Sequence, residues 1–430
     1  MSFREWVERL RASGKLTEAK KPLSRNLQAA AFIKTLEPKP LLLRVEDSEI
    51  AVAANVCASR ELMAEYLNIQ THQITAKLLT AIEHPTKPKQ TDSPPCFEVA
   101  EERVDLNQLP LLLHAEKDGG RYISSAIVIA HHPELGQNVS FHRLMQIGKD
   151  ELAIRIVPRH LQTILEKSGG ELPVAICIGN APNVLLAGAC SVELGRDELE
   201  IANTLEPLTV AKCAEANCFV PAESEFVLVG RITNRLHEEG PFIDLTETYD
   251  LVRSQRVVKV ERVYHREQPI YHALVPGGLE HKMLIGTPRE PTIYREVSKV
   301  CDCVDVVITP GGASWLHAIV KIRKKRDDDG LRAIDAAFRG HTSLKHVLIV
   351  DEDIDPGDPA EVEWAFATRF QGDRGLVVRA SETGSSLDPS ANPETRRTTK
   401  VGFDATKPLH AKGKNFEKAK FPEVDWREFT

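Results

Sequence analysis

The stretch Asn138-Val-Ser-Phe-His-Arg143 decides more about this chain than any other. It has the polar character of a strand end, and it closes on an arginine. A planar guanidinium can hold a carboxylate through two parallel hydrogen bonds. The commoner role of such an arginine is a structural ion pair. The segment therefore predicts a carboxylate site only where other residues support it.

Further along the chain, two more polar side chains could complete a site with Asn138. His160 and Glu225 add an imidazole and a carboxylate to the amide oxygen. This mixed set suits Mn²⁺ or Mg²⁺ better than zinc, because oxygen ligands dominate. Spacing alone also allows a surface histidine and a helix-capping asparagine.

Glu280 follows the turn Pro276-Gly-Gly and precedes an apolar stretch. A glutamate held among apolar groups favours its protonated form and can act as a general acid. The alternative is a glutamate at a helix start, where it interacts favourably with the helix dipole.

The composition is that of a globular chain without an electrostatic preference for nucleic acid. The 430 residues carry a formal net charge of -7 and are 42% hydrophobic, which suggests two or three domains. No apolar run is long enough to span a membrane, and no signal peptide is recognisable. The scattered cysteines, mostly in apolar stretches, are typical of buried thiols in a reducing cytoplasm. We expect a cytoplasmic protein with no nucleic-acid or membrane partner.

The order of predicted elements indicates a mixed α/β (α+β) chain with three domains. Residues 1–95 read as an N-terminal α/β domain that ends in a proline-rich linker. Residues 96–290 are rich in short Val- and Ile-containing strands, which favours a barrel or sandwich core. Residues 291–430 return to an α/β pattern and end in an extended tail. The chain lacks the glycine-rich nucleotide fingerprints of common dehydrogenases and kinases.

Read in order, these and other stretches resemble the UbiD family of decarboxylases along essentially the whole chain. The matching stretches are Gly120–Ser125, Asn138–Arg143, Val157–His160, Val220–Gly230, Glu239–Phe242, Glu280–Gly286, Val350–Asp355, Trp364–Arg369 and Gly402–Thr406.

The resemblance implies that residues 96–290 form a split β-barrel that binds prenylated FMN and that residues 291–430 serve in oligomerisation. It implies Mn²⁺ (or Mg²⁺) with K⁺ nearby, both next to the cofactor phosphate. Asn138, His160 and Glu225 would be metal ligands, and Ala222 and Glu223 would lie at the potassium site. The cofactor-binding residues would be Asn138, Ser140, Arg143, Arg159, His160 and Glu225.

By the same resemblance, the reaction is a reversible non-oxidative decarboxylation of an α,β-unsaturated or aromatic acid. Arg143 would hold the carboxylate and Glu280 would donate the proton. A flavin prenyltransferase would supply the cofactor, and the chain would form a homodimer or homohexamer. Family habit also places Ser314–His317 near the pocket.

One departure from the family pattern concerns the substrate. Some members carry a second acid five residues before the late glutamate, where this chain has Val275. Asp244 and His281 are the nearest replacements. The stretch around Gly278 is most similar to shorter archaeal-type members, some of which act on a phosphorylated anhydromevalonate-type acid. Two alternatives remain: a metal-dependent hydrolase that activates water with the Asn, His and Glu set, and a non-catalytic subunit of a carboxylase complex.

Overall fold

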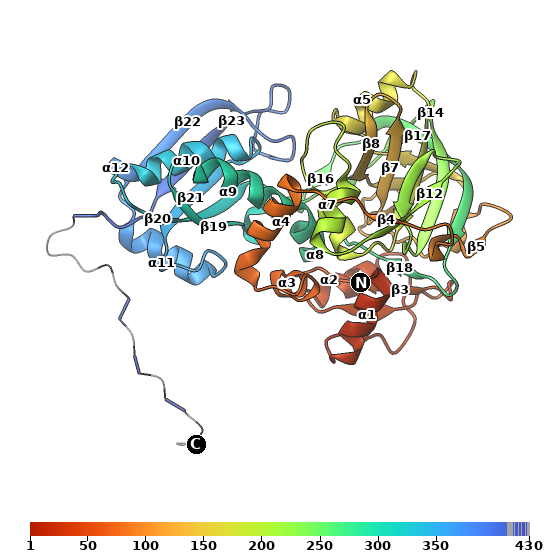
Figure 1. Ribbon diagram of the computed structural model, residues 1–430, viewed down its shortest axis with the longest axis horizontal. Helices are drawn as coiled ribbons and strands as arrows, with labels where there is room; N and C mark the ends of the chain where they lie inside the picture. Colours follow the sequence, from red (N-terminus) through yellow and green to blue (C-terminus); the bar gives the residue numbers. More distant parts are fainter. Residues whose placement is uncertain (411–415, 417, 420, 423, 426, 428–430) are drawn as a thin grey trace.

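The computed structural model describes residues 1–410 together with 416, 418, 419, 421, 422, 424, 425 and 427. Three main sheets, each with its own helices, follow one another along the chain (Figure 1). The predicted mixed α/β class is confirmed. The predicted tail lies largely outside the described residues.

The N-terminal unit is a small four-stranded sheet with helices packed around it. Helix α1 (Phe3–Ala12) begins with a capping box, in which the side chains of Ser2 and Glu5 each accept the other's backbone N–H. Its apolar residues recur at helical spacing and are buried. The other helices are α2 (Gln28–Thr35), α3 (Arg60–Tyr66) and α4 (Ile74–Glu83). The sheet order is β1 (Thr17–Glu18), β2 (Leu41–Leu43), β3 (Ala51–Ala54) and β18 (Ile270–His272).

Strand β18 comes from the segment assigned by sequence to the central domain. It pairs in parallel with β3, so the chain returns to the N-terminal sheet just before Glu280. The domain boundaries at 95 and 290 stay predictions, but the two units share this strand.

The central unit is a nine-stranded sheet built around two long strands, β14 (Phe226–Glu239) and β17 (Arg253–His265). Apart from β5, its strands run in the order β6-β9-β10-β17-β14-β11-β7-β8. Their bounds are β5 (Val99–Ala100), β6 (Tyr122–Ile123), β7 (Ile127–His132), β8 (Gly136–Phe141), β9 (Leu144–Gln146), β10 (Glu151–Ile154) and β11 (Leu172–Ile178). The end strands β6 and β8 do not pair with each other in the described chain, so the sheet does not close into a barrel.

Short helices and two minor sheets cover the central sheet. The helices are α5 (His160–Lys167), α6 (Pro182–Gly188) and α7 (Glu198–Leu205). One minor sheet contains β4 (Lys89–Gln90), β12 (Thr209–Cys213) and β13 (Cys218–Pro221), and the other contains β15 (Phe242–Ile243) and β16 (Tyr249–Asp250).

The C-terminal unit is a five-stranded sheet with its own apolar core. Its sheet order is β19 (Asp302–Ile308), β20 (His317–Arg323), β21 (His346–Asp351), β23 (Arg397–Asp404) and β22 (Leu376–Thr383). Helices α8 (Leu279–Gly286) and α9 (Glu290–Ser298) lead into it, followed by α10 (Asp329–Gly340), α11 (Pro359–Arg369) and α12 (Gly372–Gly375).

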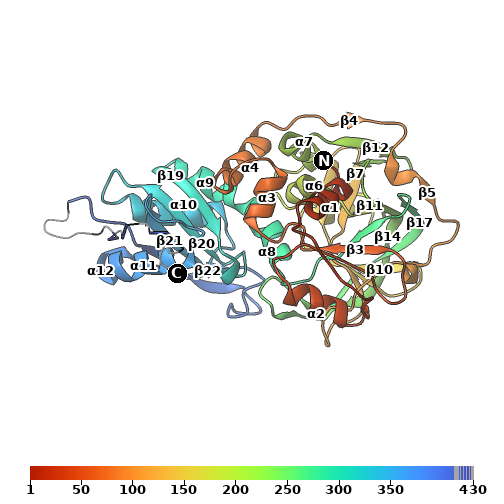
Figure 2. The ribbon, with the colours of Figure 1, turned by 90° about the horizontal axis from the view of Figure 1, so that it is seen from below.

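The C-terminal sheet stands beside the central unit, and α3, α4 and α8 lie at the junction (Figure 2). A buried ion pair between Arg60 of α3 and Glu290 of α9, at 2.7 Å, joins the N-terminal unit to the C-terminal one. Among the described helices, none is both long and apolar enough to cross a membrane.

Candidate active site

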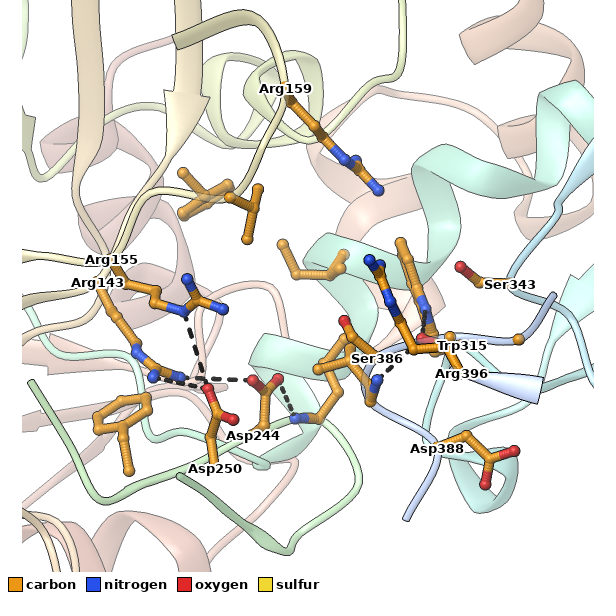
Figure 3. Close-up of a pocket in the computed structure, with 18 of the residues that line it drawn as sticks. Arg143, Arg155, Arg159, Asp244, Asp250, Trp315, Ser343, Ser386, Asp388 and Arg396 are labelled. Carbon is orange, nitrogen blue, oxygen red and sulfur yellow. Dashed lines mark hydrogen bonds and ion pairs between the residues drawn. The ribbon is translucent and has the colours of Figure 1, made fainter. Parts of the chain in front are cut away.

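A cavity of about 740 Å³ lies between the central and C-terminal units. Arg143, Arg155, Asp244 and Asp250 gather on one side of it, and Trp315, Ser343, Ser386 and Arg396 come from the other (Figure 3). Trp315 confirms the predicted lining by the Ser314–His317 region.

Arg143 follows strand β8 and is held by three carboxylates. Its Nε and Nη2 donate to the two oxygens of Glu239 at 2.9 and 3.0 Å, and Nη2 also reaches Asp250 at 2.9 Å. Nη1 makes only a 3.5 Å contact, to Asp244. Burial lowers the pKa of Arg143, but its hydrogen bond to Glu239 and the surrounding acids raise the pKa by more.

This arrangement allows Nη1 of the Arg143 guanidinium to exchange its partner for a ligand. Glu239 is fully buried, and it fixes the plane of Arg143 through two parallel hydrogen bonds. The long Nη1 contact is the weakest, because hydrogen bonds fade beyond about 3.2 Å. A ligand carboxylate that replaced Asp244 at Nη1 would leave the rest of the cluster intact.

Asn138 is oriented by a chain of hydrogen bonds along one face of the strand, since alternate residues share a face. His142 Nδ1 donates to the Arg155 carbonyl at 2.9 Å, so its Nε2 accepts from the Ser140 hydroxyl at 3.0 Å. Ser140 Oγ in turn accepts from Asn138 Nδ2 at 2.9 Å. The side-chain oxygen of Asn138, Oδ1, has no hydrogen bond within the described chain, and it can serve as a metal ligand.

A carboxylate that the sequence analysis missed lies next to Asn138. Glu198, at the start of α7, accepts the backbone N–H of Val139 at 2.8 Å and is 3% exposed. Burial raises the pKa of Glu198 to about 8, a cost that a bound cation would remove. In sequence, Glu198 stands in the acidic run Asp197-Glu-Leu-Glu200, which looks like an ordinary solvated helix start.

Glu225, predicted as a metal ligand, has a structural partner in Arg4. Arg4 Nη2 and Nε donate to its two oxygens at 2.7 and 3.1 Å, and the N–H of Ile270 adds a further hydrogen bond at 2.9 Å. The Glu225 side chain is completely buried. Its oxygens are thus committed to joining α1 and β18 to the central sheet.

The residues expected at a potassium site are engaged as well. Glu223 pairs with Arg266 at 2.9 Å, and the Ala222 carbonyl accepts the N–H of Cys96 at 3.0 Å. His160 is the first residue of α5 and is half-buried. Burial lowers the pKa of His160, so its ring is neutral near pH 7, as a metal ligand requires.

Glu280 points away from the cavity, whereas its neighbour His281 lines it. The carboxylate of Glu280 accepts the backbone N–H groups of Asn55 and Cys57 at 2.8 and 2.9 Å, and it lies 3.3 Å from His272. His281 Nδ1 accepts the N–H of Gly277 at 3.0 Å. Burial lowers the pKa of His281 to about 4 although Asp244 opposes this, so the ring is neutral.

Val275, where some relatives carry an acid, is buried in the apolar core. The cavity instead receives Asp244 and His281, the two replacements proposed from sequence.

Family models match nearly the whole described fold. Residues 7–82, 87–279 and 282–405 match the N-terminal domain, the Rift-related domain and the C-terminal domain of 3-octaprenyl-4-hydroxybenzoate carboxy-lyase, UbiD. The chain belongs to the UbiD family. Its structure is similar to that of the UbiD-class enzyme HmfF from Pelotomaculum thermopropionicum in complex with FMN, with a TM-score of 0.95 and 37% identity over 99% of this chain and 98% of that one.

Among UbiD relatives, two archaeal decarboxylases align over most of their length. The anhydromevalonate phosphate decarboxylase of Methanothermobacter thermautotrophicus is 44% identical over 90% of this chain and 93% of its own. The Aeropyrum pernix enzyme of the same name is 40% identical over 94% of this chain and 93% of its own.

Proposed function

We propose that this chain is a carboxy-lyase that uses prenylated FMN to decarboxylate an α,β-unsaturated acid reversibly and without oxidation. The observation that carries the proposal is Arg143 on the cavity wall, held rigidly by Glu239 and with Nη1 open to exchange. A relative of similar fold, an evolved dimeric HmfF, was solved with prFMN.

The proposed substrate is a phosphorylated anhydromevalonate-type acid. Support comes from the archaeal relatives of that name and from the charge of the cavity. Arg159 and Arg396 both line it, and neither guanidinium makes an ion pair or hydrogen bond with another described residue. A phosphate group, carried by the substrate or by the cofactor, would give these positive charges a partner.

The chain's own residues orient the substrate and move a proton. Arg143 Nη1 holds the carboxylate, and loss of CO₂ leaves electrons that no side chain can accept. Prenylated FMN, when bound, supplies that electron sink. Glu280, once it has left the amides of Asn55 and Cys57 and taken up a proton from solvent, would turn into the cavity as the neutral acid and deliver that proton. A flavin prenyltransferase supplies the cofactor, and the chain works as a homo-oligomer.

The cavity and its basic wall fit a flavin nucleotide, and the Asn138 region fits a divalent cation. We assign Mn²⁺ (or Mg²⁺) to Asn138 and His160, with Glu198 in place of Glu225. Glu198 is buried next to Asn138 and accepts only backbone N–H groups, whereas Arg4 occupies both oxygens of Glu225. K⁺ stays part of the proposal without Ala222 or Glu223 as ligands.

A pair of matched glutamine variants tests the metal assignment. Glu198→Gln is expected to lower Mn²⁺ affinity by more than the about 10- to 100-fold that outer-shell groups contribute. Glu225→Gln is expected to keep Mn²⁺ affinity but to lose about 3 kcal/mol of unfolding free energy, because it breaks the buried pair with Arg4. Metal analysis measures the bound Mn²⁺, and urea unfolding measures the stability of both variants. Full Mn²⁺ retention in Glu198→Gln, with loss in Glu225→Gln, would restore the sequence-based ligand set.

The function itself is tested with the full chain co-produced with a flavin prenyltransferase. We expect a protein that carries prenylated FMN by absorption and mass spectrometry and that releases CO₂ from phosphorylated anhydromevalonate. The unphosphorylated acid and cinnamate serve as comparison substrates. A flavin-free protein with full activity would favour the metal-dependent hydrolase instead.

A further inference from the structure

Arg289 is the one buried arginine of the described chain without a carboxylate partner. It is 8% exposed, and its guanidinium makes no hydrogen bond or ion pair with any described residue. Its Nε is buried and unsatisfied. By contrast, the equally buried Arg25 and Arg369 each pair with aspartate, the latter with Asp351 at 2.8 Å. Buried charges without a partner are costly and are rarely retained.

The surroundings of Arg289 add further positive charge. Burial, together with a smaller effect of repulsion from Arg159, lowers the pKa of Arg289 to about 10, and among its neighbours Cys190 acts in the opposite direction. The pKa of His341 falls to about 3 through burial and through Arg289, Lys400 and Arg159. Arg159 from the central unit and Lys400 from the C-terminal unit thus add positive charge around Arg289 and the neutral ring of His341.

This basic cluster of Arg159, Arg289, His341 and Lys400 adjoins the active-site cavity. The Arg289 guanidinium stacks on Trp315, with its carbon 5.2 Å from the ring centroid. Trp315 and Arg159 both line the cavity, as do Thr342 and Ser343 just after His341. Figure 3 shows Arg159 pointing into the cavity toward the side that carries Trp315. His341 Nε2 lies 3.1 Å from the Trp315 carbonyl, which holds this wall in place.

We infer that Arg289 and Arg159 together bind the phosphate group of a phosphate monoester at the junction of the two units. A planar guanidinium presents paired donors that match phosphate oxygens, and a dianion would balance the excess charge of the cluster. This inference rests on the proposed function only for the identity of the molecule that carries the phosphate. Both the flavin mononucleotide and a phosphorylated acid carry such a group.

The test measures binding by the full-length protein freed of flavin, so it needs no turnover. Arg289→Met and Arg159→Met are compared with Arg295→Met, which removes an exposed arginine from the next helix. The probes are FMN, riboflavin and inorganic phosphate. Flavin binding is measured by the quenching of flavin fluorescence, and phosphate binding is measured by the rise in Tm that phosphate causes. We expect Arg289→Met to lose phosphate stabilisation and Arg295→Met to keep it.

The comparison of FMN with riboflavin identifies the molecule that carries the phosphate. If the phosphate belongs to the cofactor, Arg289→Met lowers the affinity for FMN about 10- to 100-fold, as expected for lost charge-assisted hydrogen bonds. The affinity for riboflavin, which has no phosphate, stays unchanged. If the phosphate belongs to the substrate, FMN affinity stays and the KM for the phosphorylated acid rises by a similar factor. Arg289→Lys should recover part of either loss.

A purely structural role for Arg289 gives a different result. Without ligand, removing an unpaired buried charge should leave the Tm of Arg289→Met equal to or above that of the wild type. A fall in this ligand-free Tm, with unchanged affinities for FMN and phosphate and an unchanged KM, would overturn the inference. A protein that binds phosphate through Arg289 but does not decarboxylate would contradict the proposed function alone.

Discussion

Replacing Arg143 with methionine is expected to reduce kcat/KM for decarboxylation by about 10²- to 10³-fold, the loss typical of one preorganised charged donor. The variant removes the guanidinium that, in our proposal, orients the substrate carboxylate through Nη1. It also leaves Glu239 buried without its cation, which should cost about 3–5 kcal/mol of unfolding free energy. Steady-state kinetics and urea unfolding measure the two effects.

A second substitution separates chemistry from folding. In Arg143→Met combined with Glu239→Gln, no buried carboxylate is left unpaired, and Tyr122 can still donate to the new amide as it does to Glu239 at 3.1 Å. We expect this double variant to regain stability and FMN binding but not turnover. If it regained turnover as well, Arg143 would be a purely structural residue.

Glu280→Gln is expected to lower kcat by about 10²- to 10⁴-fold, the usual contribution of general acid catalysis. Glutamine keeps the size of the side chain but cannot deliver a proton. It offers only one acceptor to the N–H groups of Asn55 and Cys57, so a modest loss of about 1–3 kcal/mol in stability should accompany it. Solvent-deuterium incorporation into the product, with kcat, follows the proton step.

His281→Asn is the matched comparison for Glu280→Gln. His281 lines the cavity next to Asp244, but its neutral ring makes it a positioning residue in our proposal. Its substitution should therefore change KM more than kcat. Normal activity in Glu280→Gln together with loss of deuterium incorporation in His281→Asn would transfer the proton-donor role to His281.

Much of the site was predictable because its residues come in short motifs. Arg143 and Trp315 lie on the cavity wall as expected, as do Asp244 and His281, the two candidates for replacing the acid missing at Val275. The fold class followed from the change in strand and helix pattern along the chain.

The proposed exchange of Glu225 for Glu198 in the metal set depends on long-range packing. Arg4 lies 221 residues before Glu225 in the sequence, and nothing local indicates that these two side chains meet. Glu198 was overlooked because an acidic run at a helix start is usually solvated, whereas packing of α7 against β8 buries it. Arg289 follows Pro288 in a stretch without any catalytic pattern, and only its missing partner in three dimensions draws attention to it.

The cavity has one wall from residues 124–285 and another from residues 315–396. Arg143, which we propose holds the carboxylate, belongs to the first wall, and the loop between β22 and β23, with Ser386 and Arg396, belongs to the second. In our proposal, bond cleavage is therefore encoded in the first stretch, whereas a separate loop contributes to recognition of the remainder of the substrate. Exchanging that loop between relatives should redirect substrate choice while the chemistry is inherited unchanged, which makes it a natural crossover segment for recombination.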